Sequence, residues 1–244
     1  MLIWGLAAAG CYRQPVPDLS NLPSAPSQAA EPSPGGSVAT PPEEPAPEAP
    51  AVRRYRVVDS RMLVKVYRAG RLARLGHNHT IEASILGSFS LEDDRVKAEL
   101  YVRPAELLVD RPETRAAQGE DFAGAIKPKD VEGTRGNLLS EKVLNPLEHP
   151  FIRATIDDSA DADGSVTVTF ELAGATATQA LDVERLNDSF CRPAFRGAVT
   201  LGHDDFGLTP FSILGGAVSV ANDFEVSFTL AGDLEVQDGG VCQD

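Results

Sequence analysis

Alternation of apolar and polar residues is the feature of this sequence that most restricts its fold. Every second residue is apolar in VKAELYV at 96–102, and the same period recurs in SVTVTFEL at 165–172 and DFEVSFTL at 223–230. A period of two places successive side chains on opposite faces of a β-strand. Strands with one apolar and one polar face are typical of antiparallel sheets. The pattern therefore predicts an antiparallel β-sheet with one buried face.

The number of such segments predicts that this sheet closes on itself. From position 54 onward the spacing indicates about eight to ten strands, joined by short polar turns such as LEDDR at 91–95 and DADG at 161–164. A large sheet with one apolar face loses its exposed edges by closing into a barrel. We therefore expect an all-β domain over residues 53–238, built as a lipocalin-like, up-and-down antiparallel β-barrel.

One stretch departs from the period of two. Residues 118–147 include QGEDFAGAIK and NLLSEKVL, whose apolar residues recur at helical spacing. Pro128, Pro146 and Pro150 lie within or just beyond this stretch. We expect a small helical excursion between two sets of strands.

The N-terminal segment differs in composition from the rest of the chain. Residues 1–11, MLIWGLAAAGC, form an apolar run that ends in small residues and a cysteine and is too short to cross a bilayer. It resembles the end of a bacterial lipoprotein signal, although no Lys/Arg-rich start precedes it and Ala8 stands where Leu is commoner. We expect lipidation of Cys11, with a plain secretory signal peptide as the alternative.

A spacer follows this signal-like segment. Residues 12–52 carry 11 of the 18 prolines, separated by Ser, Ala and Glu. Such a segment cannot bury enough apolar surface to offset the entropy of ordering it, so it predicts a disordered tether. We expect a periplasmic lipoprotein held at a bacterial membrane, most simply the outer membrane, by its N-terminal lipid anchor.

Charge and cysteine content restrict the partners further. The formal net charge is −14, from 36 acidic against 22 basic residues, which argues against a nucleic-acid partner. If Cys11 is acylated, Cys191 and Cys242 remain as a pair, and a disulfide or two free thiols are both compatible with the sequence. A homodimer is left open as an oligomeric state.

The order of these features resembles the YceI-like family of exported bacterial barrels, of the polyisoprenoid-binding type. The resemblance covers roughly residues 53–232. It is carried by YRVVDSRMLVKVYRAG at 55–70, LGSF at 86–89, LLSEKVLNPLEHPFIRATI at 138–156 and LGHDDFGLTPFSILGGAVSVANDFEVSF at 201–228. The resemblance implies a long apolar lumen that holds a polyisoprenoid or another amphiphile.

The sequence also departs from the family pattern. ELAGATATQALDV at 171–183 replaces a turn that the family usually carries. GHNH at 76–79 and DRPETR at 110–115 resemble a subgroup rather than the isoprenoid-binding type. The resemblance therefore implies the fold more directly than the identity of the ligand.

The alternation assigns a set of residues to the inner face of the predicted barrel. A barrel of about eight strands can be filled by its own side chains or can hold one slender ligand. The resemblance favours a cavity with a polyisoprenoid or fatty-acyl ligand over a packed core. The residues expected to contact such a ligand are Val64, Val66, Ile81, Ala83, Ile85, Phe89, Val168, Phe170, Phe224, Val226 and Phe228.

Three of the four histidines share the parity of the apolar positions. His77 and His79 open HNHTIEASILGSF, and His203 closes FRGAVTLGH. We expect all three at strand ends, facing the lumen. Neutral imidazole suits Zn, Cu or Fe, so three at one mouth would form a divalent-metal site or bind a polar head group. The alternative is that they form hydrogen bonds to backbone carbonyls or water.

These observations lead to two function hypotheses. No phosphate loop, nucleophile elbow or strand-end acid pair occurs, so we expect no enzyme. The first hypothesis is an exported, membrane-tethered barrel that binds a lipid-like or isoprenoid-like amphiphile in its lumen. The second is a metal- or haem-binding redox or stress accessory protein that uses the rim histidines.

Overall fold

The computed structural model describes residues 52–92, 95–157 and 165–235, together with residues 16, 17, 19, 20, 22, 23 and Cys242. Three sequence predictions therefore fall outside the described residues. They concern the signal-like segment with Cys11, most of the spacer at 12–52, and the turn at 161–164.

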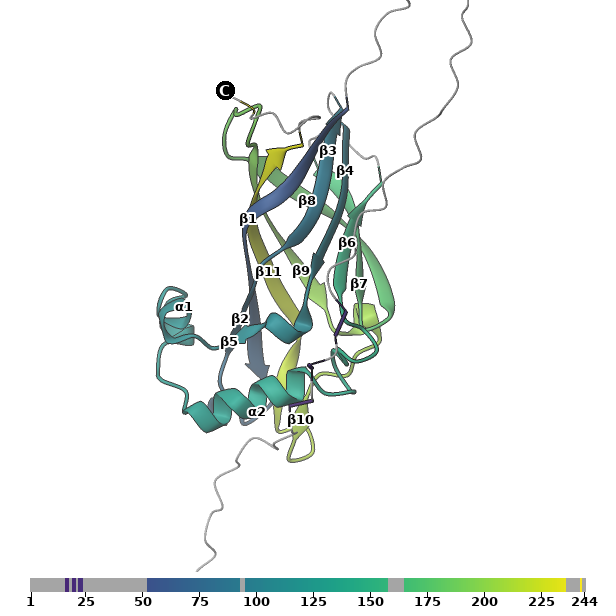
Figure 1. Ribbon diagram of the computed structural model, residues 1–244. Helices are drawn as coiled ribbons and strands as arrows, with labels where there is room; N and C mark the ends of the chain where they lie inside the picture. Colours follow the sequence, from purple (N-terminus) through teal and green to yellow (C-terminus); the bar gives the residue numbers. More distant parts are fainter. Residues whose placement is uncertain are drawn as a thin grey trace, which may run out of the picture.

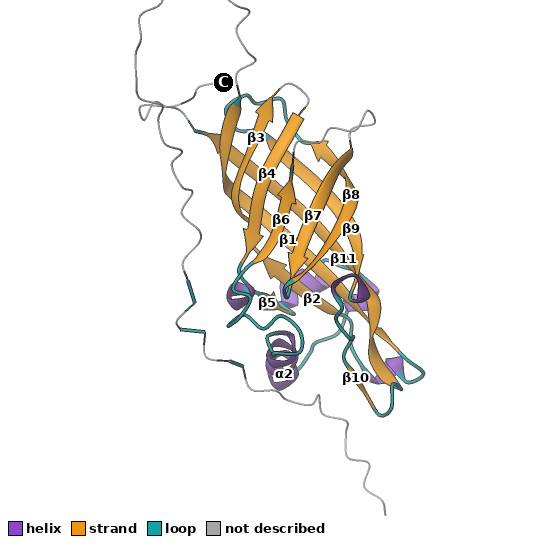
Figure 2. Ribbon diagram, turned by 90° about the vertical axis from the view of Figure 1, so that its right-hand side faces the viewer, coloured by secondary structure: helices purple, strands orange, loops and turns teal. Residues whose placement is uncertain are grey.

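The described residues form a closed antiparallel barrel with short helices at one end (Figure 1, Figure 2). Eight of the described strands make a ring in the order β1–β3–β4–β6–β7–β8–β9–β11, and β11 pairs back with β1. This confirms the predicted all-β, lipocalin-like architecture. The strands are β1 (Arg53–Ala69), β2 (His79–Ala83), β3 (Leu86–Glu92), β4 (Arg95–Val102), β5 (Leu108–Val109), β6 (Ile152–Ile156), β7 (Ser165–Leu172), β8 (Ala175–Arg185), β9 (Ala194–Gly202), β10 (Ser212–Ile213) and β11 (Val218–Leu234).

The two longest strands close the ring. β1 and β11 contain 17 residues each and pair from Tyr55↔Leu234 to Ala69↔Ser219, with two register shifts along the way. β1 runs from the far end of the barrel toward the end at which the helices lie (Figure 1). Because β11 pairs with both β9 and β1, the ring is closed by long ladders at this point, whereas β8 and β9 pair only from Val183↔Gly197 to Arg185↔Phe195.

The predicted strand that follows the two histidines is broken in the structure. β2 pairs with the second half of β1, whereas β3 pairs with the first four residues of β1. Ser84 and Ile85 therefore connect two separate strands, β2 and β3. The hydroxyl of Ser60 compensates for this break, because it donates to the Ile85 carbonyl at 2.9 Å and accepts from the Ile85 amide at 2.8 Å. The alternation survives the break, since Ile81 and Ile85 are both buried on the lumen side.

A glycine allows β3 and β4 to pair closely after this break. Gly87 adopts a left-handed φ of 122°. A Cβ at this position would lie 2.1 Å from the carbonyl oxygen of Glu99 on β4. A larger side chain would therefore push the two strands apart. This explains why the segment LGSF at 86–89 has a glycine at position 87.

The helical excursion lies between β4 and β6 and begins earlier than the predicted residues 118–147. The excursion contains α1 (Pro112–Ala116), α2 (Pro128–Leu138) and 3-10 turns at Pro104–Glu106 and Glu120–Phe122. QGEDFAGAIK at 118–127 contains only a 3-10 turn and no α-helix. The predicted helix in NLLSEKVL is wrong beyond Leu138. There the chain turns back, with the Leu144 amide bonded to the Leu138 carbonyl and Asn145 at a left-handed φ of 42°. The turn is favoured because it buries both Leu139 and Leu144.

The excursion covers one end of the barrel, and α2 lies across that end (Figure 1, Figure 2). Two more 3-10 turns lie in loops, at Ala73–Leu75 and Asp204–Phe206. No helix among the described residues is long and apolar enough to span a bilayer. Leu19 is partly buried against the main hydrophobic cluster, so at least this point of the predicted spacer contacts the barrel.

A disulfide joins Cys191 to Cys242, with their Cα atoms 5.5 Å apart. It ties the C-terminal tail to the loop between β8 and β9. The same loop is held to the barrel by the Tyr55 hydroxyl, which donates to the Phe190 carbonyl at 3.1 Å, and by the Leu234 amide, which donates to the Cys191 carbonyl at 2.9 Å. The structure thus has the disulfide and not the two free thiols.

We expect Ser60→Ala to destabilise the barrel, because both backbone groups of Ile85 lose their partner. Each unsatisfied buried group costs about 1–3 kcal/mol, so the free energy of unfolding should fall by about 2 kcal/mol. Urea unfolding followed by circular dichroism measures this change. Ser84→Ala, at an exposed site one residue before Ile85, is the matched control. Equal stability of the two variants would contradict the role given to Ser60.

Candidate functional site

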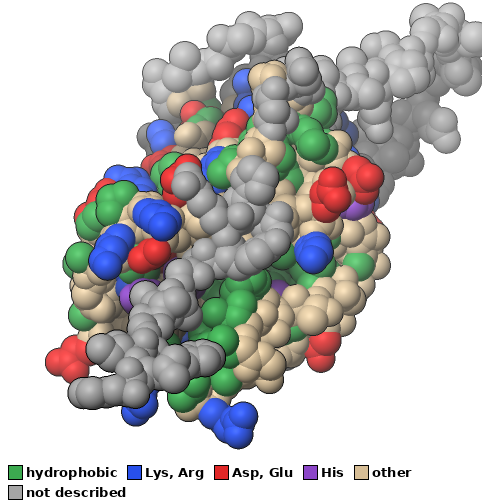
Figure 3. All heavy atoms as spheres, turned by 90° about the horizontal axis from the view of Figure 1, so that it is seen from below, with side chains coloured by type: hydrophobic (Ala, Val, Ile, Leu, Met, Phe, Trp, Pro, Cys, Tyr) green, Lys and Arg blue, Asp and Glu red, His purple; other side chains and the backbone are tan. Residues whose placement is uncertain are grey.

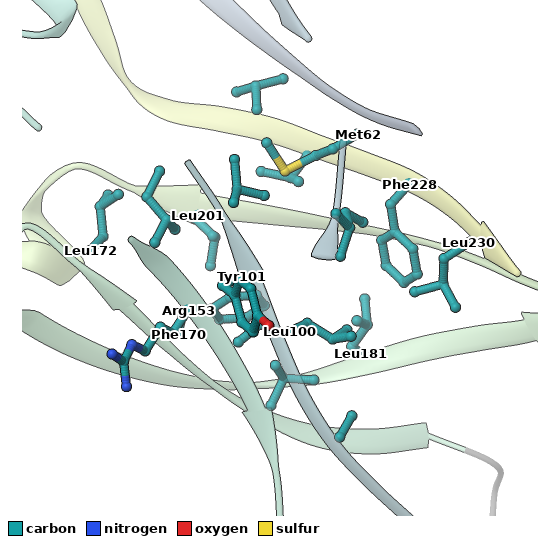
Figure 4. Close-up of a pocket in the computed structure, with 18 of the residues that line it drawn as sticks. Met62, Leu100, Tyr101, Arg153, Phe170, Leu172, Leu181, Leu201, Phe228 and Leu230 are labelled. Atoms are coloured by element: carbon teal, nitrogen blue, oxygen red, sulfur yellow. The ribbon is translucent and has the colours of Figure 1, made fainter. Parts of the chain in front are cut away.

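The barrel encloses an apolar cavity of about 710 Å³, which we call the lumen. Side chains from facing strands point into it, among them Phe228 and Leu230 of β11 and Leu181 of β8 (Figure 4). Cavities of about 300–1,000 Å³ are typical of small-molecule sites in proteins. The lumen is therefore large enough to hold a ligand and is not filled by the core.

The lumen is almost entirely hydrocarbon. Among the lining residues in the described part of the chain, four carry a polar side-chain group: Tyr101, Arg153, Ser165 and His203. Arg153 directs its guanidinium away from the space (Figure 4). An apolar ligand in the lumen would therefore deprive few polar side chains of a hydrogen-bond partner.

The structure places ten of the eleven predicted ligand-contacting residues in the lining. The exception is Ala83, which ends β2 at the break and is partly buried against the main hydrophobic cluster. The prediction assumed that the strand continues through this position. The ten that line the lumen are Val64, Val66, Ile81, Ile85, Phe89, Val168, Phe170, Phe224, Val226 and Phe228.

Sequence reasoning missed the residues that narrow one end of the lumen. Leu107, Leu138 and Leu144 come from the excursion, and Phe206 and Leu208 come from the loop after β9. Their apolar character is visible in the sequence, but the period of a strand gives no information on loops. At this end the excursion and the loop together form the mouth of the barrel.

A second cavity of about 200 Å³ lies at this mouth, and we call it the histidine pocket. His77, His79 and His203 all line it, together with Asp130 and Asn137 of α2. In the view from this end, small patches of histidine side chain are visible at the surface (Figure 3). The histidine pocket shares five lining residues with the lumen: Val66, Ile81, Leu138, Val143 and His203.

His79 is held by a buried carboxylate. Its Nδ1 lies 2.6 Å from Oδ2 of Asp110, whose side chain has no exposed surface. Oδ1 of Asp110 accepts from the Thr80 amide at 3.0 Å and from Nη1 of Arg115 at 2.8 Å. Burial alone would raise the pKa of Asp110, but the hydrogen bond and charge of His79, the Thr80 amide and the Arg115 guanidinium together hold it below the usual range.

Asp110 also fixes the excursion to the barrel. It follows β5, which pairs with β2, and it adopts a left-handed φ of 54° while its amide donates to the Thr80 carbonyl at 2.8 Å. Arg115 on α1 donates to the Asn78 carbonyl as well as to Asp110. An unfavourable backbone conformation is thus offset by a buried ion pair and its hydrogen bonds.

Two neighbouring side chains extend the same attachment. The Asn78 side chain accepts from the Arg68 amide at 2.9 Å and donates to the Asp121 carbonyl at 3.0 Å. The hydroxyl of Thr114 on α1 donates to Glu82 on the outer face of β2. Glu82 is therefore buried although it lies on the polar face of the alternating pattern.

His203 is held by the backbone. Its Nδ1 lies 2.6 Å from the carbonyl oxygen of Asn222, and its ring meets that of Phe224 edge-on at a centroid distance of 5.0 Å. This is the carbonyl contact that the sequence left open as the alternative to metal binding. His77 is more exposed, and desolvation of its ring, followed by the nearby His79 and Arg115, lowers its pKa.

The histidines are not arranged as a metal centre. The rings of His77 and His79 are 6.5 Å apart between centroids. Within the part of the chain that the structure describes, no group of three or more His, Cys, Asp or Glu side chains is close enough to hold a metal ion. The predicted set of His77, His79 and His203 therefore shares a pocket, but the described residues do not assemble it into a metal site.

No family model and no curated protein matches this chain. Among solved structures, it is similar to BcnA from Burkholderia cenocepacia, at 12% identity over 70% of this chain and 95% of that chain, with a TM-score of 0.46. It is also similar to a polyisoprenoid binding domain from Saccharophagus degradans, at 11% identity over 74% and 98%, with a TM-score of 0.49. A Campylobacter jejuni YCEI protein matches at 12% identity over 83% and 94%, with a TM-score of 0.41.

We expect Asp110→Asn to destabilise the protein in a pH-dependent way. Removing one partner of a buried ion pair costs on the order of 3 kcal/mol at neutral pH. Because the folded-state pKa of Asp110 is depressed, its contribution is fully present above the unfolded value of about 3.9 and is lost as the pH falls through the folded value. The stability difference from the wild type should therefore shrink below about pH 4.

Urea unfolding at a series of pH values measures this difference. Asp59→Asn, at an exposed position on β1, is the matched control. A difference from the wild type that is the same at low and neutral pH would show that the charge of Asp110 does not support the fold.

Proposed function

We propose that this protein binds a lipid-like amphiphile whose apolar chain occupies the lumen. The observation that carries the proposal is the cavity of about 710 Å³ inside a closed barrel, lined almost wholly by hydrocarbon and aromatic side chains. An apolar chain in such a space gains about 0.8 kcal/mol for each buried methylene. It also supplies the dispersion contacts that the lining side chains would otherwise lack.

An isoprenoid-like chain is the ligand class that the sequence resemblance implies. A domain of Saccharophagus degradans with a similar architecture is named for binding polyisoprenoid. We extend the broad class to this chain because its lumen is large and apolar. The chemistry of the lining does not separate an isoprenoid from a fatty-acyl chain. We assign no reaction to the lumen, since the described lining offers hydrocarbon contacts in place of a set of reactive groups.

We further propose that the protein is exported and tethered at a bacterial outer membrane. The support comes from the signal-like residues 1–11 that end in Cys11 and from the proline-rich residues 12–52. The disulfide between Cys191 and Cys242 agrees with an oxidising compartment such as the periplasm. A lipid anchor on Cys11 would then hold a lipid-binding barrel near a source of its ligand.

We expect Ala154→Leu to weaken ligand binding while the barrel stays folded. Ala154 on β6 lines the lumen, so a larger side chain there displaces about three methylene groups of a bound chain. The loss of roughly 2 kcal/mol corresponds to at least a tenfold increase in Kd. Titration with a fluorescent long-chain fatty acid measures this value.

Ala180→Leu is the matched control, because Ala180 is exposed on the outer face of β8. Circular dichroism and thermal unfolding verify that both variants fold. If Ala154→Leu and Ala180→Leu bind the probe equally well, the chain does not occupy the lumen at β6. If the wild type binds no apolar probe, the proposed function is wrong.

A further inference from the structure

We infer that the histidine pocket binds the head group of this amphiphile, and that the head group is an uncharged hydrogen-bond donor, as in a long-chain alcohol. The inference rests on the proposed function, because it assigns the polar end of a ligand whose chain fills the lumen. Its evidence is separate, because it comes from the hydrogen bonds of the histidines and not from the apolar lining.

The position of the histidine pocket fits the polar end of such a ligand. Five residues belong to the walls of both cavities, and four of them, Val66, Ile81, Leu138 and Val143, are apolar. The fifth is His203. A chain that leaves the lumen between these side chains therefore meets imidazole groups directly after its last apolar contacts.

The fixed hydrogen bonds of two histidines decide which ring nitrogen remains available. A backbone carbonyl can only accept, so Nδ1 of His203 donates to Asn222. Nδ1 of His79 donates to the ionised carboxylate of Asp110, which likewise can only accept. In the neutral state of both rings, the remaining Nε2 atoms carry lone pairs and act as acceptors. A ligand head group that complements these two Nε2 acceptors must donate a hydrogen bond.

The charges around the histidine pocket favour an uncharged donor. Asp130 and Arg68 both line it, so a negative and a positive group offset each other there. The guanidinium of Arg115, whose charge acts on His77, is buried and already bonded to Asp110 and the Asn78 carbonyl. A charged head group would lose its hydration without gaining a dedicated counter-ion. The lowered pKa of His77 likewise favours a neutral imidazole at this rim.

A purely structural role does not account for His79 equally well. The Thr80 amide and Arg115 already compensate the Asp110 carboxylate within the protein. His79 adds a ring whose side chain keeps 17% of its surface exposed, whereas Arg115 keeps 5% and Asp110 none. His79 is thus the member of this cluster that reaches the histidine pocket.

The test compares 1-tetradecanol with its methyl ether, which has nearly the same apolar surface but cannot donate a hydrogen bond. Displacement of a fluorescent fatty-acid probe at pH 8, above the ordinary imidazole pKa of about 6.5, gives the affinities. We expect the wild type to bind the alcohol roughly tenfold more tightly than the ether, the effect of one or two neutral hydrogen bonds. Myristate and tetradecylamine report on charged head groups.

The double variant His79→Phe/His203→Phe should keep the affinity for the ether and lose the preference for the alcohol. His149→Phe is the matched control, because His149 lines neither cavity. Should the double variant fail to fold, His203→Phe alone is used, since His203 lies outside the Asp110 cluster, and the wild-type preference still decides the matter.

Each outcome separates the two proposals. Equal binding of alcohol and ether by the wild type would overturn the head-group inference and leave binding in the lumen intact. If myristate or tetradecylamine binds most tightly of the four compounds, the head-group inference is wrong and the pocket binds a charged head group. An alcohol preference that survives in the folded double variant would place the head group elsewhere. If none of the four compounds binds, the proposed function itself fails.

Discussion

The buried carboxylate of Asp110 is the interaction on which the functional end of this barrel depends. It receives hydrogen bonds from β2 through the Thr80 amide, from α1 through Arg115 and from the ring of His79. These contacts fix the excursion against the outer face of β2 and orient the His79 imidazole. The position of the mouth and the protonation pattern of the histidine pocket therefore have a common physical origin.

Much of the fold could be predicted from the sequence, because alternation is a local property that antiparallel pairing preserves. Val168, Phe170, Val226 and Phe228 lie on the lumen face as their parity indicates. The break after Ala83 could not be predicted in this way, because it depends on the Ser60 hydroxyl of another strand. The alternation of apolar and polar residues predicts which face of the sheet a residue lies on. The position at which a strand ends depends on hydrogen-bond partners that are distant in sequence.

The candidate site was less accessible to sequence reasoning. The parity of His77, His79 and His203 indicated their inward direction, but the partner of His79 is Asp110, which lies 31 residues further along the chain. Pairing of β5 with β2 brings the two together, and two residues are too few to give β5 a recognisable pattern. The choice between a packed core and a cavity was also undecidable from sequence, because it depends on how the strands tilt around the ring.

Closure of the ring by β1 and β11 has a consequence for the order of events during synthesis. Among the described strands, β1 is made first and β11, which pairs with β1 along most of its length, is made last. Until residues 218–234 are available, β1 and β9 lack that neighbour and the apolar inner faces of the sheet are open to solvent. A chain that stops short of β11 thus leaves the backbone groups of β1 and β9 unpaired along one edge of each strand, and these edges can pair with other chains. The lumen is enclosed only after β11 has been made.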